Sequence, residues 1–245
     1  MLIGALVARS FNVAVPLVVA STYCFFIGLE GLKRARLRAH ADGGSLWQVF
    51  PVTSKLFLLT AAFCGAAAVW IGDRWVLVFW ALLSLLCVTA YTALLVERRE
   101  RSTVAEWIGI LGITLSAGVA WSAGTGRFEV EAFYLWGICF LYFAGSVPYV
   151  RLRVKQMKEG TAPLRTRVHR ARDALLYGVV ALGLVVLGAW ADSYAWVMLL
   201  PFTLTLGKLA WVVVRDRPPR SLAAVGYGEI FYASVFTLVA IVAFW

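Results

Sequence analysis

The strongest constraint on this chain is a series of eight apolar runs, most of them close to twenty residues long. An α-helix rises about 1.5 Å per residue, so a run of this length matches the roughly 30 Å hydrocarbon core of a bilayer. Backbone polar groups in lipid must be bonded within the segment, which makes each span a helix. The predicted spans are Val13–Leu32, Phe50–Ile71, Trp75–Val96, Val104–Ala123, Phe133–Val150, Ala174–Ala191, Ala195–Val214 and Leu222–Trp245.

Composition excludes a water-soluble globule. Of the 245 residues, 62% are hydrophobic and 15% are charged, whereas soluble domains carry about a quarter charged residues. The sequence predicts an all-α fold, a polytopic transmembrane helical bundle in which residues 1–245 form a single domain. Glycines within the runs, such as Gly118 and Gly183, are expected at close helix contacts. The four cysteines lie in apolar runs without metal-ligand spacing and are expected to be buried hydrophobic residues.

One further apolar fragment, Leu2–Ala8, is too short to cross a bilayer. It looks like the outer half of a first helix whose inner half is missing. We expect that the natural protein begins upstream of Met1 and has nine spans with its N-terminus in the cytoplasm. The alternative is a half-inserted hairpin.

Orientation follows from the basic residues in the short loops, because Lys and Arg accumulate on the cytoplasmic side. One set of alternate loops holds four, three, eight and three Lys/Arg, eighteen in all, and the other set holds three. The eighteen lie in Lys33–Gly44, Glu97–Arg101, Arg151–Arg172 and Arg215–Arg220. We therefore place these loops in the cytoplasm and the C-terminus outside. The net charge of +10 lies in loops, which argues against nucleic-acid binding.

Ionisable residues inside the spans are candidates for function, because burying charge in a membrane costs free energy. They occupy only the predicted cytoplasmic third. Lys208 and Glu229 lie at similar depth on consecutive spans, which predicts an ion pair. Glu229 and Glu106 are candidate catalytic, proton-transferring groups. The alternative is that each side chain extends to the inner interface, as we expect for Glu30 and Lys55.

The segment after Gly145 suggests a binding site for an anionic head group. Pro148 is expected to kink or end its helix, and Asp173 is expected to cap the next one. Arginine offers forked donors to phosphate, although residues spaced by two on a regular helix point in different directions. The candidate substrate-binding residues are Tyr149, Arg151, Arg153, Lys155 and Lys208. The alternative is a basic loop that contacts anionic lipid.

Common catalytic and nucleotide-binding motifs are absent from the sequence. It contains no P-loop, no G-x-S-x-G and no H-E-x-x-H. His40 and His169 lack partners at metal-ligand spacing. We expect no metal site and no cofactor.

Several stretches resemble the YwiC-like family of bacterial inner-membrane proteins. They are Leu2–Ala8, Glu30, Glu106, Tyr149–Lys155 and Val225–Ile230. The family's usual His-Gly-Ala-Trp stretch is missing here. The nine-helix plan also looks like that of UbiA-type prenyltransferases, in which aspartate-rich motifs on two cytoplasmic loops hold magnesium and diphosphate. The corresponding loops here, Lys33–Gly44 and Arg151–Arg172, are basic, which argues against metal-dependent prenyl transfer.

These features favour a multi-pass protein of the bacterial inner membrane that binds or modifies a prenyl-like or anionic lipid in a pocket open to the cytoplasm. Its expected partners are membrane lipids with anionic head groups. The alternatives are a small-solute transporter and a non-catalytic scaffold subunit. The apolar outer half argues against transport, because alternating access needs a polar path to both sides.

Overall fold

The computed structural model describes residues 4–5, 12–42, 50–96, 102–191, 194–215, 217–219 and 221–244. Within these residues the fold is helical, and eight segments are long and apolar enough to cross a membrane. This confirms the predicted all-α polytopic bundle with eight full spans. Most of the fragment Leu2–Ala8 lies outside the described residues. Gly4 and Ala5 are its described residues, and both are helical. A ninth span stays a prediction.

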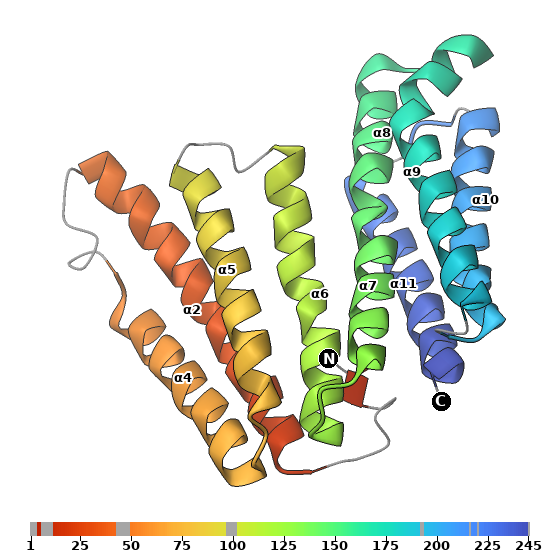
Figure 1. The fold of residues 1–245 in the computed structure, drawn as a ribbon. Helices are drawn as coiled ribbons and strands as arrows, with labels where there is room; N and C mark the ends of the chain where they lie inside the picture. The colour runs from red at the N-terminus through yellow and green to blue at the C-terminus, as the bar shows by residue number, and fades with distance from the viewer. Residues whose placement is uncertain are drawn as a thin grey trace. The chain divides into compact units, whose positions relative to one another are not determined.

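Five of the eight predicted spans agree with the structure within two residues at each end, when the short turn η1 Trp196–Met198 and the helix after it are taken as one span (Figure 1). The α-helices are α2 Ala14–Asp42, α4 Val52–Gly72, α5 Val76–Val96, α6 Thr103–Thr125, α7 Val130–Ala144, α8 Ser146–Glu159, α9 Leu164–Trp190, α10 Leu199–Arg215 and α11 Leu222–Phe244. A 3-10 turn, η1 Trp196–Met198, precedes α10.

The prediction that Arg151–Arg172 forms a loop is wrong. In the structure this segment is a helical hairpin. The α8 helix continues to Glu159, four residues link the helices, and α9 begins at Leu164. Asp173 therefore lies inside α9 and is not an N-cap. The cause is that hydropathy marks where lipid ends, whereas Lys, Arg and Gln are good helix formers in water. Gly160, with φ of 70°, ends α8 in a conformation that favours glycine.

The interruption expected near Pro148 is present, three residues earlier. The α7 helix ends at Ala144, and α8 begins again at Ser146 after the single residue Gly145. Pro148 lies in the first turn of α8, where a missing N–H is tolerated. The hydroxyl of Tyr177, on α9, donates to the carbonyl of Leu141 just before this break at 2.7 Å.

The chain divides into two compact units, the first formed by residues 1–83 and 116–132. Here α2 packs along α4, and Ser21 Oγ donates to the carbonyl of Ala61 at 2.7 Å. A Cβ added at Gly31 would lie 1.8 Å from Ser54 Oγ, so this contact requires glycine. At the end of α6, the amide of Asn12 donates to the carbonyls of Ala123 and Gly124, each at 3.0 Å.

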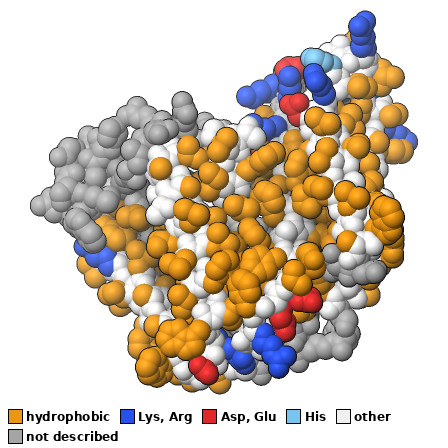
Figure 2. All heavy atoms as spheres, in the orientation of Figure 1, with side chains coloured by type: hydrophobic (Ala, Val, Ile, Leu, Met, Phe, Trp, Pro, Cys, Tyr) orange, Lys and Arg blue, Asp and Glu red, His pale blue; other side chains and the backbone are white. Residues whose placement is uncertain are grey.

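The second unit is formed by residues 84–115 and 133–245. A cluster of apolar residues joins α8, α9 and α10, which lie side by side in Figure 1. The buried members are Leu152, Ala171, Ala174, Leu209 and Val213. Figure 2 shows hydrophobic side chains over the middle of these helices and a concentration of Lys and Arg at the end formed by the α8–α9 hairpin. Such a surface is suited to lipid at its centre and to water at that end. Whether the whole chain folds as one domain stays a prediction.

Candidate functional site

The predicted ion pair between Lys208 and Glu229 is present in the second unit. Lys208 Nζ lies 2.6 Å from Glu229 Oε1, and the side chains are 10% and 27% exposed. Lys208 is seven residues before the end of α10, and Glu229 is seven residues after the start of α11. At 1.5 Å per residue, both lie about 10 Å from the helix ends. Their helices thus place opposite charges at one depth.

Two tyrosine rings complete the surroundings of the Lys208 ammonium group. Its Nζ lies 4.1 Å from the ring centroid of Tyr149 on α8 and 4.3 Å from that of Tyr232 on α11. Cations over aromatic faces within about 6 Å are attracted to the ring electrons, more strongly when water is excluded. Tyr149 was a predicted site residue. Tyr232 was missed, although its position three residues after Glu229 places both on one face of α11.

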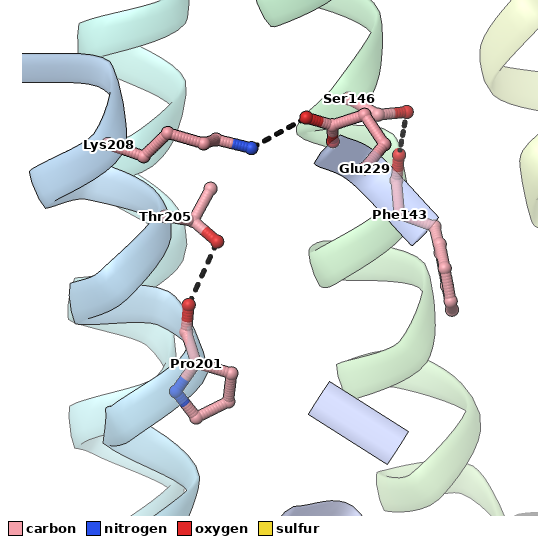
Figure 3. Close-up of polar contacts among 6 residues, drawn as sticks. All are labelled: Phe143, Ser146, Pro201, Thr205, Lys208 and Glu229. Atoms are coloured by element: carbon pink, nitrogen blue, oxygen red, sulfur yellow. Dashed lines mark hydrogen bonds and ion pairs between the residues drawn. The ribbon is translucent and has the colours of Figure 1, made fainter. Parts of the chain in front are cut away.

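Nearby hydroxyl groups are bonded to backbone carbonyls, across the α7–α8 break for Ser146 and within α10 for Thr205. Ser146 Oγ donates to the carbonyl of Phe143 at 2.6 Å, and Thr205 Oγ1 donates to the carbonyl of Pro201 at 2.8 Å. Figure 3 shows Lys208 extending from α10 to Glu229, with these two bonds beside the pair. The ammonium group therefore has the carboxylate and the two aromatic faces as its described partners.

A small cavity lies between α7, α8, α9 and α10, bordered by Tyr149, Thr205 and Tyr177 among others. Its volume is about 30 Å³. A cavity of this size accommodates water but not a lipid head group. Lys208 and Glu229 are not among the described residues that line it, although Tyr149, whose ring contacts Lys208, is.

Glu106 and Arg151 form a second pair of predicted residues. Arg151 Nη2 lies 3.0 Å from Glu106 Oε2, and Arg151 also donates to the hydroxyl of Thr103. Both charged side chains are about 40% exposed, at 39% and 44%. Glu106 lies in the first turn of α6, where a carboxylate is favoured by the helix dipole. This pair lies at the polar end of the unit, closer to water than Lys208.

Arg153 and Lys155 do not join Arg151 at its pair with Glu106. Arg153 Nη1 donates to Gln156 Oε1 at 2.7 Å and to the carbonyl of Arg217 at 3.1 Å. Its Nε is buried and has no hydrogen-bond partner among the described residues. Lys155 is exposed. Because α8 is regular here, Arg151, Arg153 and Lys155 do not converge on one ligand, as their spacing by two indicated.

The two ionisable residues expected at the interface lie in the first unit. Glu30 pairs with Arg34 at 3.2 Å, and both side chains are more than half exposed. Lys55 Nζ lies 5.8 Å from the ring centroid of Phe50. Among the residues that the structure describes, no three His, Cys, Asp or Glu side chains gather in a way that would hold a metal ion.

Comparisons with known proteins return no family model, no curated protein and no solved structure that matches this chain. The fold alone therefore defines its class, that of an all-α polytopic membrane protein. Its second unit holds an ion pair between spans, enclosed by tyrosines, about 10 Å from the ends of α10 and α11.

Proposed function

We propose that this protein binds the anionic head of an amphipathic lipid, of the prenyl-phosphate or acidic phospholipid kind, at the cytoplasmic face of the bacterial inner membrane. The single observation that carries the proposal is the Lys208 ammonium group, held inside the spans by Glu229 and two tyrosine rings. A charged side chain inside the spans of a membrane protein is costly and rare, and such residues mark substrate and ion pathways.

Arg153 supports the same ligand chemistry. Its buried Nε–H lacks an acceptor among the described residues, and a buried donor without an acceptor costs about 1–3 kcal/mol. Arg153 lies one turn of α8 after Tyr149, whose ring contacts Lys208. A phosphate oxygen is a suitable acceptor for both basic side chains once the Lys208–Glu229 contact opens.

The proposed orientation places the basic loops, and thus the α8–α9 hairpin, in the cytoplasm. In this orientation a lipid head enters from the inner interface. Glu229 and Glu106 then stand at the same end of the unit as candidate proton-transfer groups. Each carboxylate is held by a cation, so proton transfer requires its pair to separate first.

The proposal is tested by whether removing the negative charge of Glu229 strengthens or weakens the binding of an anionic lipid. In Glu229→Gln the ammonium group loses its competing anion, so farnesyl phosphate should bind the purified protein about tenfold more tightly, since a hydrogen bond to a charged group contributes roughly 1.5–3 kcal/mol. The double variant Lys208→Met/Glu229→Leu should lose this binding. Lys158→Met, on the exposed end of α8, is the matched control and should leave it unchanged.

If the protein is a scaffold subunit, the wild type and the three variants should all bind farnesyl phosphate with the same affinity, or not at all. A transporter of small cations predicts the opposite sign, with Glu229→Gln weakening binding of the cation. Native mass spectrometry in detergent gives the bound fraction directly for each variant.

A further inference from the structure

The eight basic residues from Arg151 to Arg172 differ in what they contact. Three of them bond to α8, to the end of α10 or to the segment after it. Arg167 donates to the carbonyls of Val213 and Val214 at the end of α10, at 3.1 and 2.7 Å. Arg170 pairs with Glu159 at 2.9 Å, which joins α9 to α8, and Arg153 donates to the backbone carbonyl of Arg217, just beyond α10. These three residues hold the hairpin together and attach it to the end of α10 and the segment that follows.

A second group of cations faces outward along α9. Arg165, His169 and Arg172 are exposed and form no hydrogen bond or ion pair with the described residues. Positions i, i+4 and i+7 lie within about 60° of one another around a helix and within about 10 Å along it. Long side chains on such a stripe can reach one ligand. Asp173, the nearest acid on the helix, lies at the edge of the stripe, about 40° around from His169 and about 80° from Arg165.

The basic stripe continues directly into an apolar surface. Leu176 and Val179 follow on the same face, 60% and 58% exposed, and a shallow open hollow of about 760 Å³ is bordered by these residues and the three cations. The helix runs on through an exposed Leu187 to Trp190. One face of α9 therefore offers cations at one end and a hydrocarbon-facing surface beyond them. Such a face is complementary to a phospholipid, because the cations match its negative phosphate and the apolar surface matches its acyl chains.

We propose that this stripe is a binding site for an acidic phospholipid, with its phosphodiester on Arg165, His169 and Arg172 and an acyl chain along Leu176 and Val179. Phosphate oxygens accept the forked donors of arginine. The site is separate from Lys208 and does not depend on the function proposed above.

The α8 helix provides a matched control within the same hairpin. Lys155 and Lys158 are also exposed cations three residues apart. One and two turns earlier on their face lie Arg151, which pairs with Glu106, and the buried Val147, so this stripe does not continue into an exposed apolar surface. Removing two charges from either helix changes the net charge of the protein equally. Only the α9 change removes the proposed site.

The test is a titration of the full-length chain in detergent with palmitoyl-oleoyl phosphatidylglycerol, followed by native mass spectrometry. Arg165→Gln/Arg172→Gln should weaken the tightest binding event about 25-fold, at about fivefold for each cation removed. Lys155→Gln/Lys158→Gln should change it less than twofold. Palmitoyl-oleoyl glycerol, which has the same chains without phosphate, should bind the wild type at least tenfold more weakly.

Equal losses in the two double variants would assign the effect to net charge and overturn the site. An unchanged affinity in the α9 variant, or equal binding of the neutral lipid, would also overturn it. A lipid-free dimer that dissociates in the α9 variant would assign this face to a second copy of the chain. Farnesyl phosphate binding at Lys208 should be unchanged in the α9 variant, so the two proposals can fail independently.

Discussion

At the residue scale, the burial of Lys208 determines how the protein responds to substitution. Removing one member of a buried ion pair leaves the other charge without compensation, which costs about 3 kcal/mol. We expect Lys208→Met and Glu229→Leu each to destabilise the protein by about this amount. The double variant should recover most of the loss, because it leaves no isolated charge. A double-mutant cycle on unfolding in detergent measures the coupling, and additive losses would contradict the pair.

Two glycines differ sharply in what they contact. A Cβ at Gly118 would lie 2.6 Å from Trp80 and 3.1 Å from the carbonyl of Ala132, whereas nothing lies within 4 Å of a Cβ at Gly183. Close packing, expected at both positions, is present only at Gly118. We expect Gly118→Ala to destabilise by about 1–3 kcal/mol.

The matched substitution Gly183→Ala is expected to be neutral or stabilising by up to about 1 kcal/mol, since alanine is the better helix former. Thermal unfolding in one detergent compares the two variants. Equal shifts in Tm would mean that the contact between Gly118 and Trp80 is not important for stability.

The sequence predicted the depth of Lys208 and Glu229 but not the full set of groups around them. Depth depends on position along a helix, which hydropathy and loop length determine. The tyrosine rings depend on how α8 and α11 are rotated about their axes, and an apolar run with few polar residues carries little information on rotation. Tyr149 was found because it stands beside Pro148 and Arg151, and Tyr232 lacked such neighbours.

At the scale of elements, the α8–α9 hairpin is the main difference between expectation and structure. The prediction ended one helix at Val150 and began the next at Ala174, where the apolar runs end. The helices continue beyond these points because their Lys, Arg and Gln residues are good helix formers in water. Arginine side chains add contacts around the hairpin, and Arg167 donates to the carbonyls of Ala162 in the linker and of Val213 and Val214 at the end of α10.

Arg167→Gln should therefore loosen the hairpin without affecting the spans. We expect amide hydrogen exchange to accelerate about tenfold in residues 160–167 and 211–215, as the end of α10 loses a bonded cation. Exchange in the middle of α9 should stay unchanged. Arg165→Gln, on the outward face, is the control and should leave exchange in both segments as in the wild type.

At the scale of the whole molecule, the described residues include eight helices long and apolar enough to cross a membrane. In the second unit, Glu106, Lys208 and Glu229 lie within about 10 Å of an end of their helices, and Arg151 pairs with Glu106. The distance of each ionisable residue from the nearest basic loop predicted these depths, because a helix rises about 1.5 Å per residue. The division into two compact units had no counterpart in the sequence pattern, since packing between apolar helices leaves little trace in composition.

The most direct test is the side of the membrane on which the hairpin lies. Single cysteines replace Lys158, at the tip of α8, and Asp73, between α4 and α5, in a protein whose four natural cysteines are changed to alanine. A membrane-impermeant maleimide added to intact cells should label the Asp73→Cys protein and leave the Lys158→Cys protein unlabelled until the cells are opened. Labelling of Lys158→Cys in intact cells, with Asp73→Cys protected, would place the charged end outside and contradict the account.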